Sequence, residues 1–207
     1  MQNIYVVTHA QSEHHVTAVV GGWYDTGLTN LGKVQATKVA NKIRVLTSES
    51  NIRLISSDLK RAAKTASIIG NSIGVETALD AGFRENSYGI AEGKPQHWLN
   101  ERIVAAPIDN RLDHKVIEGA ESKREFVTRI YASMSNLPTD RDVVIVTHGY
   151  ALTFIISHWI GLTLEQTGFV NFSTKPASIT HLQDGGFFSN KAVKYLSDTS
   201  HLTENSV

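Results

Sequence analysis

The chain has 207 residues, 41% of them hydrophobic, so it can form one domain with a sizeable core or one domain carrying a modest insertion. Lysine plus arginine equals aspartate plus glutamate at 20 each, which leaves the molecule without the basic field that gathers nucleic acid or an anionic membrane. The lack of cysteine excludes disulfides, thiolate metal sites and cysteine nucleophiles, and agrees with a reducing compartment.

The N-terminal stretch has no basic segment and no apolar run long enough for a signal peptide or a membrane span, so we expect a cytoplasmic protein without a membrane partner. The strands and helices that follow alternate along the chain. They are, in order, strand 4–7, helix 31–46, strand 53–55, a helix from near Leu59, strand 75–78, helix 122–134, strand 142–146, helix 151–160, and strands 178–182 and 192–195 joined by a turn at 184–186.

This alternation predicts an α/β fold, a three-layer sandwich with a mainly parallel sheet and helices on both faces. Residues 95–119 lack a sustained period and contain Pro107. We interpret them as an excursion over the site, an insertion at about 95–120 with a short helix at 96–104, inside a single domain of residues 1–207. Parallel sheets place their sites at the carboxyl ends of strands, and two of these strands end in Thr-His.

Four short signatures carry the chemistry. In chain order they are VTHAQSE at 7–13, SSDLKRA at 56–62, FRE at 83–85 and VTHG at 146–149. With Gly22-Trp23, Asp25 and the GAES segment at 119–122, they resemble the histidine phosphatase superfamily, also called the phosphoglycerate mutase-like proteins. The resemblance runs from the first strand to about His201 and implies the phosphoglycerate mutase-like fold.

The resemblance implies that His9 is phosphorylated, that His148 and Arg61 bind the phosphoryl oxygens, and that Glu85 protonates the leaving oxygen. The chemistry of these side chains agrees. A neutral imidazole is a competent nucleophile near neutral pH, and a covalent intermediate divides one hard displacement into two easier ones. A guanidinium fork stabilises charge on the equatorial oxygens, and a buried carboxylic acid can protonate a poor alkoxide leaving group. The further candidates for contact with substrate or phosphate are Thr8, His15, Trp23 and Gly149.

Structural roles compete with these assignments. A histidine at a strand end is often a hydrogen-bonded structural residue, and Trp23 is more often a packing residue than a stacking one. Arg84 and Glu85 could form a surface ion pair. His14 and His15 with His9 could suggest a metal, but adjacent residues rarely converge on one ion and no carboxylate cluster accompanies them, so we expect no metal and no cofactor.

The nucleophile signature departs from the Arg-His-Gly that is usual in the family, because this chain has Thr8-His9-Ala10. Each charge-assisted bond from the missing arginine would contribute about 1.5–3 kcal/mol. Thr8 can offer one neutral hydroxyl, and His15, which stands where a phosphate-binding Asn is usual, could restore a cation if protonated. Ala10 is expected to place a Cβ near the substrate and to narrow the pocket.

We expect a phosphomonoesterase that hydrolyses a small phosphorylated metabolite through a phosphohistidine intermediate. Such an enzyme is a phosphoric monoester hydrolase of the histidine acid phosphatase type. A phosphoglycerate mutase-type phosphotransferase is the nearest alternative, although the short excursion and a tail at 200–207 without lysine or arginine oppose it. A catalytically weak protein that binds a phosphorylated ligand is the third. The partners expected are the small phosphorylated substrate and no nucleic acid, with the protein a monomer or a homodimer.

Overall fold

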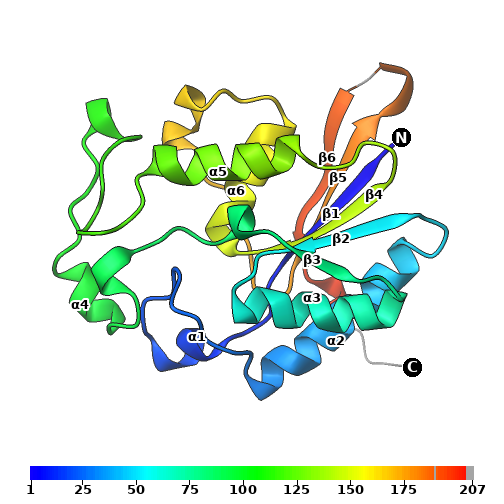
Figure 1. The fold of residues 1–207 in the computed structure, drawn as a ribbon, viewed down its shortest axis with the longest axis horizontal. Coiled ribbons are helices and arrows are strands. Elements are labelled where there is room, and N and C mark those ends of the chain that lie inside the picture. Colours follow the sequence, from blue (N-terminus) through cyan, green and yellow to red (C-terminus); the bar gives the residue numbers. More distant parts are fainter. Residues whose placement is uncertain (189, 204–207) are drawn as a thin grey trace.

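The computed structural model describes residues 1–188 and 190–203. Its centre is one six-stranded sheet with the order β3-β2-β4-β1-β5-β6 (Figure 1). The strands are β1 (Asn3–Thr8), β2 (Ile52–Ser56), β3 (Thr77–Leu79), β4 (Asp142–Thr147), β5 (Ile179–Gly185) and β6 (Asn190–Asp198). The four strands from β3 to β1 run parallel, and β5 and β6 are antiparallel to their neighbours. The predicted mainly parallel sheet is therefore confirmed.

Four long helices cover the two faces of the sheet, in two layers that Figure 1 shows above and below it. They are α2 (Asn30–Leu46), α3 (Lys60–Ile73), α5 (Lys123–Ser135) and α6 (Gly149–Trp159). Alternate residues of one strand pack against opposite helix layers, because successive side chains of a strand point to opposite faces of the sheet. In β4, Val143 and Ile145 pack with α5 and α6, whereas Val144 and Val146 pack with α2 and α3. The three-layer sandwich is confirmed.

Short elements make up the rest of the described chain. They are α1 (Glu13–Thr17), α4 (Gln96–Asn100), α7 (Ser200–Thr203) and the 3-10 turns Ala81–Phe83, Gly89–Ala91, Ile108–Asn110, Glu165–Phe169 and Gly186–Phe188. The excursion at 95–119 carries α4 and one of these turns, and in Figure 1 α4 lies beside α1, at the end of the molecule away from α7. The single domain, the oligomeric state and the tail beyond residue 203 stay predictions, and the last lies outside the described residues.

Several predicted boundaries are wrong, among them those of the third strand, the excursion helix and the hairpin turn, and α1 was not predicted. The third strand begins at Thr77 rather than 75, because Gly74 ends α3 in the left-handed conformation with φ of 70° and delays the strand. The excursion helix ends at Asn100, well before 104. The hairpin turn follows residue 185, since Gly185 still pairs with Asn190 in the β5–β6 ladder. The five residues of α1 bury no side chain, so they leave little apolar pattern to detect.

None of the helices in the described part of the chain is both long enough and apolar enough to cross a membrane. The cytoplasmic location stays a prediction.

Candidate active site

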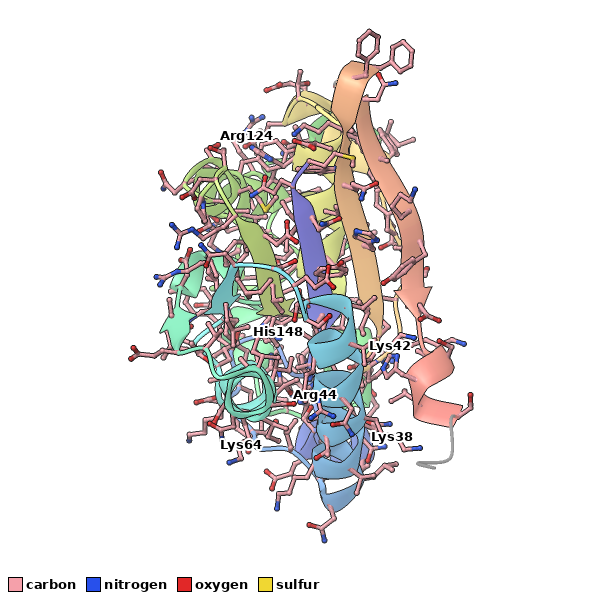
Figure 2. The ribbon with its side chains drawn as sticks, turned by 90° about the vertical axis from the view of Figure 1, so that its right-hand side faces the viewer. Lys38, Lys42, Arg44, Lys64, Arg124 and His148 are labelled. Atoms are coloured by element: carbon pink, nitrogen blue, oxygen red, sulfur yellow. The ribbon has the colours of Figure 1, made fainter. Side chains whose placement is uncertain are left out.

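The sheet brings the two Thr-His segments together. β1 and β4 are adjacent and parallel with Thr8 opposite Thr147, so His9 and His148 follow the same edge of the sheet. Their ring centroids lie 5.0 Å apart with the planes at 66°. In Figure 2, His148 lies at the end of β4. The two histidines therefore lie side by side at the carboxyl ends of neighbouring parallel strands, where such sheets place their sites.

The hydrogen bonds of His9 define its tautomer. Nδ1 lies 2.8 Å from the Ala10 carbonyl oxygen, which can only accept, so Nδ1 carries the proton. The Nε2 lone pair is then free to accept from Nε of Arg61 at 3.2 Å. Burial and then the charge of Arg61 lower the pKa of His9 well below its usual value. His9 is therefore a neutral imidazole whose Nε2 can act as a nucleophile.

Arg61 is the second residue of α3 and is 1% exposed. Besides its bond to His9, it donates from Nη1 to the Tyr24 carbonyl oxygen at 3.0 Å and from Nη2 to the Gly22 carbonyl oxygen at 2.6 Å. Gly22 has φ of 53°, which a side chain rarely allows. Because a guanidinium has five N–H donors and three are used here, two remain for an anion.

His148 lies beside His9 and is fully buried, with 0% of its surface exposed. Its Nε2 lies 2.8 Å from Oγ of Ser57, and its buried Nδ1 has no hydrogen-bond partner among the described residues. Burial and then the charge of Arg61 lower the pKa of His148, so the ring is neutral. A buried polar atom without a partner costs free energy, which makes Nδ1 a site for a ligand oxygen or a water.

Glu85 is held by main-chain amides. Its Oε1 accepts from the Asn86 N–H at 2.9 Å and its Oε2 from the Tyr150 N–H at 3.0 Å. Its carbonyl oxygen accepts from the Trp23 indole N–H and from Nη2 of Arg129, both at 2.7 Å. Desolvation raises the pKa of the Glu85 carboxyl, against the two amides and the nearby arginines. A raised pKa favours the protonated form that a general acid requires.

A cavity of about 200 Å³ joins these groups. Its lining residues are Thr8, His9, His14, His15, Gly22, Arg61, Glu85, Gly149, Thr174, Lys175 and Pro176. Six of the eight predicted site residues are among them. His148 and Trp23 are not, and the predicted set lacked His14, Gly22 and the Thr174–Pro176 segment. No local motif marks that segment, which is held by long-range contacts such as the hydrogen bond from Thr8 to the Lys175 carbonyl oxygen.

Trp23 does not contact the cavity, and its predicted substrate contact is corrected to a supporting one. Besides binding the Glu85 carbonyl oxygen, it donates its main-chain N–H to Oε1 of Glu92 at 3.0 Å. The Arg84 guanidinium lies 4.8 Å from the Trp23 ring centroid. Arg84 forms its ion pair with Asp58 at 2.5 Å rather than with Glu85, which leaves the Glu85 carboxylate free to face the cavity.

Thr8 and Ala10 do not have the contacts with phosphate and substrate that we expected from the sequence. The Thr8 hydroxyl donates its proton to the Lys175 carbonyl oxygen at 2.6 Å, so it has no second proton for phosphate. Ala10 is 0% exposed and packs in the core with Leu28 and Ala36, so its Cβ does not narrow the cavity. The hydrophobic core accommodates the Ala10 side chain instead.

His14 and His15 lie at the mouth of the cavity. Desolvation and then His15 lower the pKa of His14 to about 3, and desolvation and then Arg61 lower the pKa of His15. Since Nδ1 of His15 accepts from the Ser12 N–H at 3.3 Å, its Nε2 carries the proton. The expected protonated His15 is therefore replaced by a neutral N–H donor.

The ring nitrogens of His9, His14 and His15 lie within 4.8 Å of one another, close enough for a transition metal to draw them together. The guanidinium of Arg61, bonded to Nε2 of His9, opposes a second cation at that point. The same arrangement of neutral rings and one arginine suits an anion.

Known proteins resemble this chain over nearly its whole length. The family model for the histidine phosphatase superfamily (branch 1) matches residues 4–191. The chain is 29% identical over 211 residues to the protein named "Probable phosphoglycerate mutase GpmB" of Proteus mirabilis, covering 99% of this chain and 96% of that one.

Two solved phosphatases share the fold. The mycobacterial glucosyl-3-phosphoglycerate phosphatase superposes with a TM-score of 0.79 at 22% identity, over 96% of this chain and 100% of that one. The alpha-ribazole phosphatase from Shigella flexneri superposes with a TM-score of 0.77 at 18% identity, over 95% and 96%. Since the family model spans the sheet from β1 into β6, this chain belongs to the histidine phosphatase superfamily.

Proposed function

We propose that this protein is a phosphomonoesterase that hydrolyses a small phosphorylated metabolite through a phosphohistidine at His9. One observation carries the proposal. The unprotonated Nε2 of His9, the Arg61 guanidinium and the Glu85 carboxyl face one cavity of about 200 Å³. That set holds the nucleophile, the charge that stabilises the phosphoryl oxygens, and the acid for the leaving group.

The reaction has two balanced steps. Nε2 of His9 attacks phosphorus, the ester P–O bond breaks, and the proton of Glu85 goes to the leaving oxygen, which yields the alcohol. Glu85 is then a carboxylate. It takes a proton from water as the water oxygen attacks the phosphohistidine, the P–N bond breaks, and inorganic phosphate leaves with His9 neutral again.

Four residues have donors that suit the phosphoryl oxygens in this scheme. Three of them line the cavity, namely Arg61 with its two unused N–H groups, Gly149 with its amide at the start of α6, and His15 with its Nε2 proton. The fourth residue is His148, which lies beside His9 and can donate from Nδ1 once Ser57 donates to its other ring nitrogen. Lys175 lines the same cavity and forms no ion pair within residues 1–188 and 190–203. We assign it the positive charge that the family's missing arginine would supply.

The mutase remains the second candidate, because the relative from Proteus mirabilis carries a mutase name. The short excursion favours hydrolysis, since a mutase must retain a bisphosphate intermediate while it reorients. The mycobacterial phosphatase was solved in complex with VO3. A similar anion bound to this chain at the phosphoryl position would support either reaction, so only the product separates them.

Trapping the intermediate tests the proposal. We expect brief reaction with a ³²P-labelled phosphomonoester, followed by alkaline denaturation, to leave acid-labile label on the wild type and none on His9→Ala. His158→Ala is the matched control, because His158 lies on α6 away from the cavity and contacts Ser135. Label retained by His9→Ala would refute the assignment of the nucleophile.

A second measurement separates the candidate reactions. Incubation with 3-phosphoglycerate should release inorganic phosphate if water is the acceptor, and 2-phosphoglycerate if the protein is a mutase. Binding of phosphate with no label and no product from any phosphomonoester would instead support the weak phospho-ligand binding protein.

A further inference from the structure

A second, larger cavity adjoins the His9 cavity. Its volume is about 470 Å³ and its walls include Tyr88, Ile103 and Phe169. Residues in direct contact line the two cavities, because Glu85 lines one, Tyr150 lines the other, and Oε2 of Glu85 accepts from the Tyr150 N–H. A leaving group protonated by Glu85 therefore has the larger cavity beside it.

Two cations at this cavity share one acceptor. Nε of Arg111 donates to the Gly168 carbonyl oxygen at 3.1 Å, and Nζ of Lys123 donates to the same oxygen at 2.7 Å. Neither forms an ion pair with any described residue. The carboxylate nearest in the lining, Glu121, is already bound by the Arg129 guanidinium at both oxygens.

The surroundings do not explain this pair as a stabilising device. One carbonyl oxygen needs only one strong donor. Desolvation and then the like charge of Arg111 lower the pKa of Lys123. Lys123 is also the first residue of α5, where the helix dipole disfavours a cation. Arg111 is fixed by its guanidinium stacking 4.4 Å from the Phe169 ring centroid.

We propose that Arg111 and Lys123 form an anion subsite, so that the substrate is a phosphomonoester whose organic part carries a second anionic group, a carboxylate or a phosphate. The inference rests on the proposed function, because it places the phosphoryl group at His9. The organic part lies against Tyr88, Tyr150 and Phe169, and the distal anion takes N–H donors of both cations beyond those given to Gly168.

Calorimetric titration with non-hydrolysable ligands tests the subsite independently of turnover. The probes are ω-phosphonocarboxylic acids of increasing chain length, each paired with the alkylphosphonate of the same length. We expect one range of lengths at which the carboxylate strengthens binding by about tenfold or more, as charge-assisted hydrogen bonds do. The gain should fall as salt rises.

The variants are Lys123→Met and Arg111→Met, singly and together, with Arg102→Met and Lys64→Met as controls. Arg102 is the matched residue, since it stacks 4.5 Å from the Trp98 ring centroid, donates to a carbonyl oxygen and lies outside both cavities. Lys64 lies on the exposed face of α3 (Figure 2). The double variant should lose the carboxylate gain and keep the affinity for the alkylphosphonate, which also shows that it is folded.

The subsite proposal would be wrong if the phosphonocarboxylic acid and the alkylphosphonate bound equally well at every chain length. It would also be wrong if the double variant kept the gain in affinity from the carboxylate. If the double variant does not fold, Lys123→Met alone decides, because Nζ of Lys123 makes a single described hydrogen bond. A lost gain with no phosphohistidine in the wild type would leave the subsite standing and remove the proposed hydrolysis, so the two failures are distinguishable.

Discussion

The Thr8 hydroxyl donates to the main-chain carbonyl oxygen of Lys175 over 2.6 Å, although the two residues are 167 positions apart. The same hydroxyl accepts from the Ser178 N–H at 3.1 Å. Thr8 therefore fixes the segment that leads into β5 and carries Lys175 to the His9 cavity. At the position where the sequence resemblance led us to expect an arginine, this chain has a hydroxyl that anchors the segment carrying a lysine.

Lys175→Met should weaken competitive inhibition by inorganic phosphate about tenfold, because one charge-assisted hydrogen bond contributes about 1.5–3 kcal/mol and 1.4 kcal/mol is tenfold. Thr8→Val should weaken it in the same direction by releasing the segment, and Thr8→Ser should preserve it. The control is Lys42→Met, since Lys42 lies on α2 (Figure 2) and does not line the cavity. An unchanged inhibition constant for Lys175→Met would show that Arg61 suffices alone.

Glu85→Gln should lower kcat/KM for alkyl phosphates far more than for p-nitrophenyl phosphate, by about 10²–10⁴-fold for the alkyl esters. An aryl leaving group needs little protonation, whereas an alkoxide needs a full proton, which glutamine cannot give. The matched control is Glu92→Gln, since Glu92 accepts main-chain bonds nearby and does not line the cavity. Equal losses on both classes of ester would exclude Glu85 as the acid.

The sequence predicts the architecture well because its strands and helices differ in period and length. The two Thr-His segments could be paired from the sequence, since parallel strands of an open sheet share their carboxyl edge. The sequence-based prediction failed where the hydrophobic pattern is weak. Residues 13–17 bury nothing, and the strand start at Thr77 depends on how Gly74 ends α3 rather than on side-chain composition.

The site was predicted less completely because some members are joined only by long-range contacts. Lys175 reaches the cavity through its bond to Thr8, and nothing near it in the sequence marks it as a ligand. Arg111 and Lys123 meet at Gly168, which lies in a third segment. Trp23 belongs to a recognisable motif, but its role depends on which group its indole N–H binds, and that is decided by the tertiary structure.

Gly32→Ala should destabilise the protein although alanine is favoured over glycine in a helix by about 1 kcal/mol. A Cβ at Gly32 would lie 1.9 Å from the Gln11 carbonyl oxygen, a main-chain atom that cannot swing away. Overpacking costs about 1–3 kcal/mol or more, and the helix preference of alanine offsets about 1 kcal/mol of it. Because the contact is with a main-chain atom, we expect a net loss of up to about 2 kcal/mol in the free energy of unfolding. Urea denaturation measures it, with exposed Lys33→Ala as the control in the same turn. Unchanged stability would mean that the main chain around Gln11 shifts at little cost to admit the new Cβ.

The pH dependence of kcat/KM should be bell-shaped for alkyl phosphates. Because the pKa of His9 is lowered below its ordinary 6.5, the neutral nucleophile is present above that lowered value, and activity falls only at lower pH. Because the pKa of Glu85 is raised above its ordinary 4.5, the acid stays protonated to higher pH, and activity falls as pH rises through the raised value. The optimum is therefore expected between the two, on the acidic side.

Comparing two substrates assigns the alkaline limb. The second ionisation of the phosphate ester, near pH 6, affects alkyl and aryl esters alike, whereas the need for protonated Glu85 affects the alkyl ester far more. The ratio of kcat/KM for the alkyl ester to that for p-nitrophenyl phosphate should thus fall with rising pH in the wild type and stay flat in Glu85→Gln.

His15→Ala should leave the fall of this ratio in place, because the pKa of His15 is lowered and the ring acts as a neutral donor. A protonated His15 would act on the phosphoryl group of both esters. If His15→Ala removed the alkaline limb for both, the positive charge at the cavity would belong to His15, and the assignment of the limb to Glu85 would be wrong.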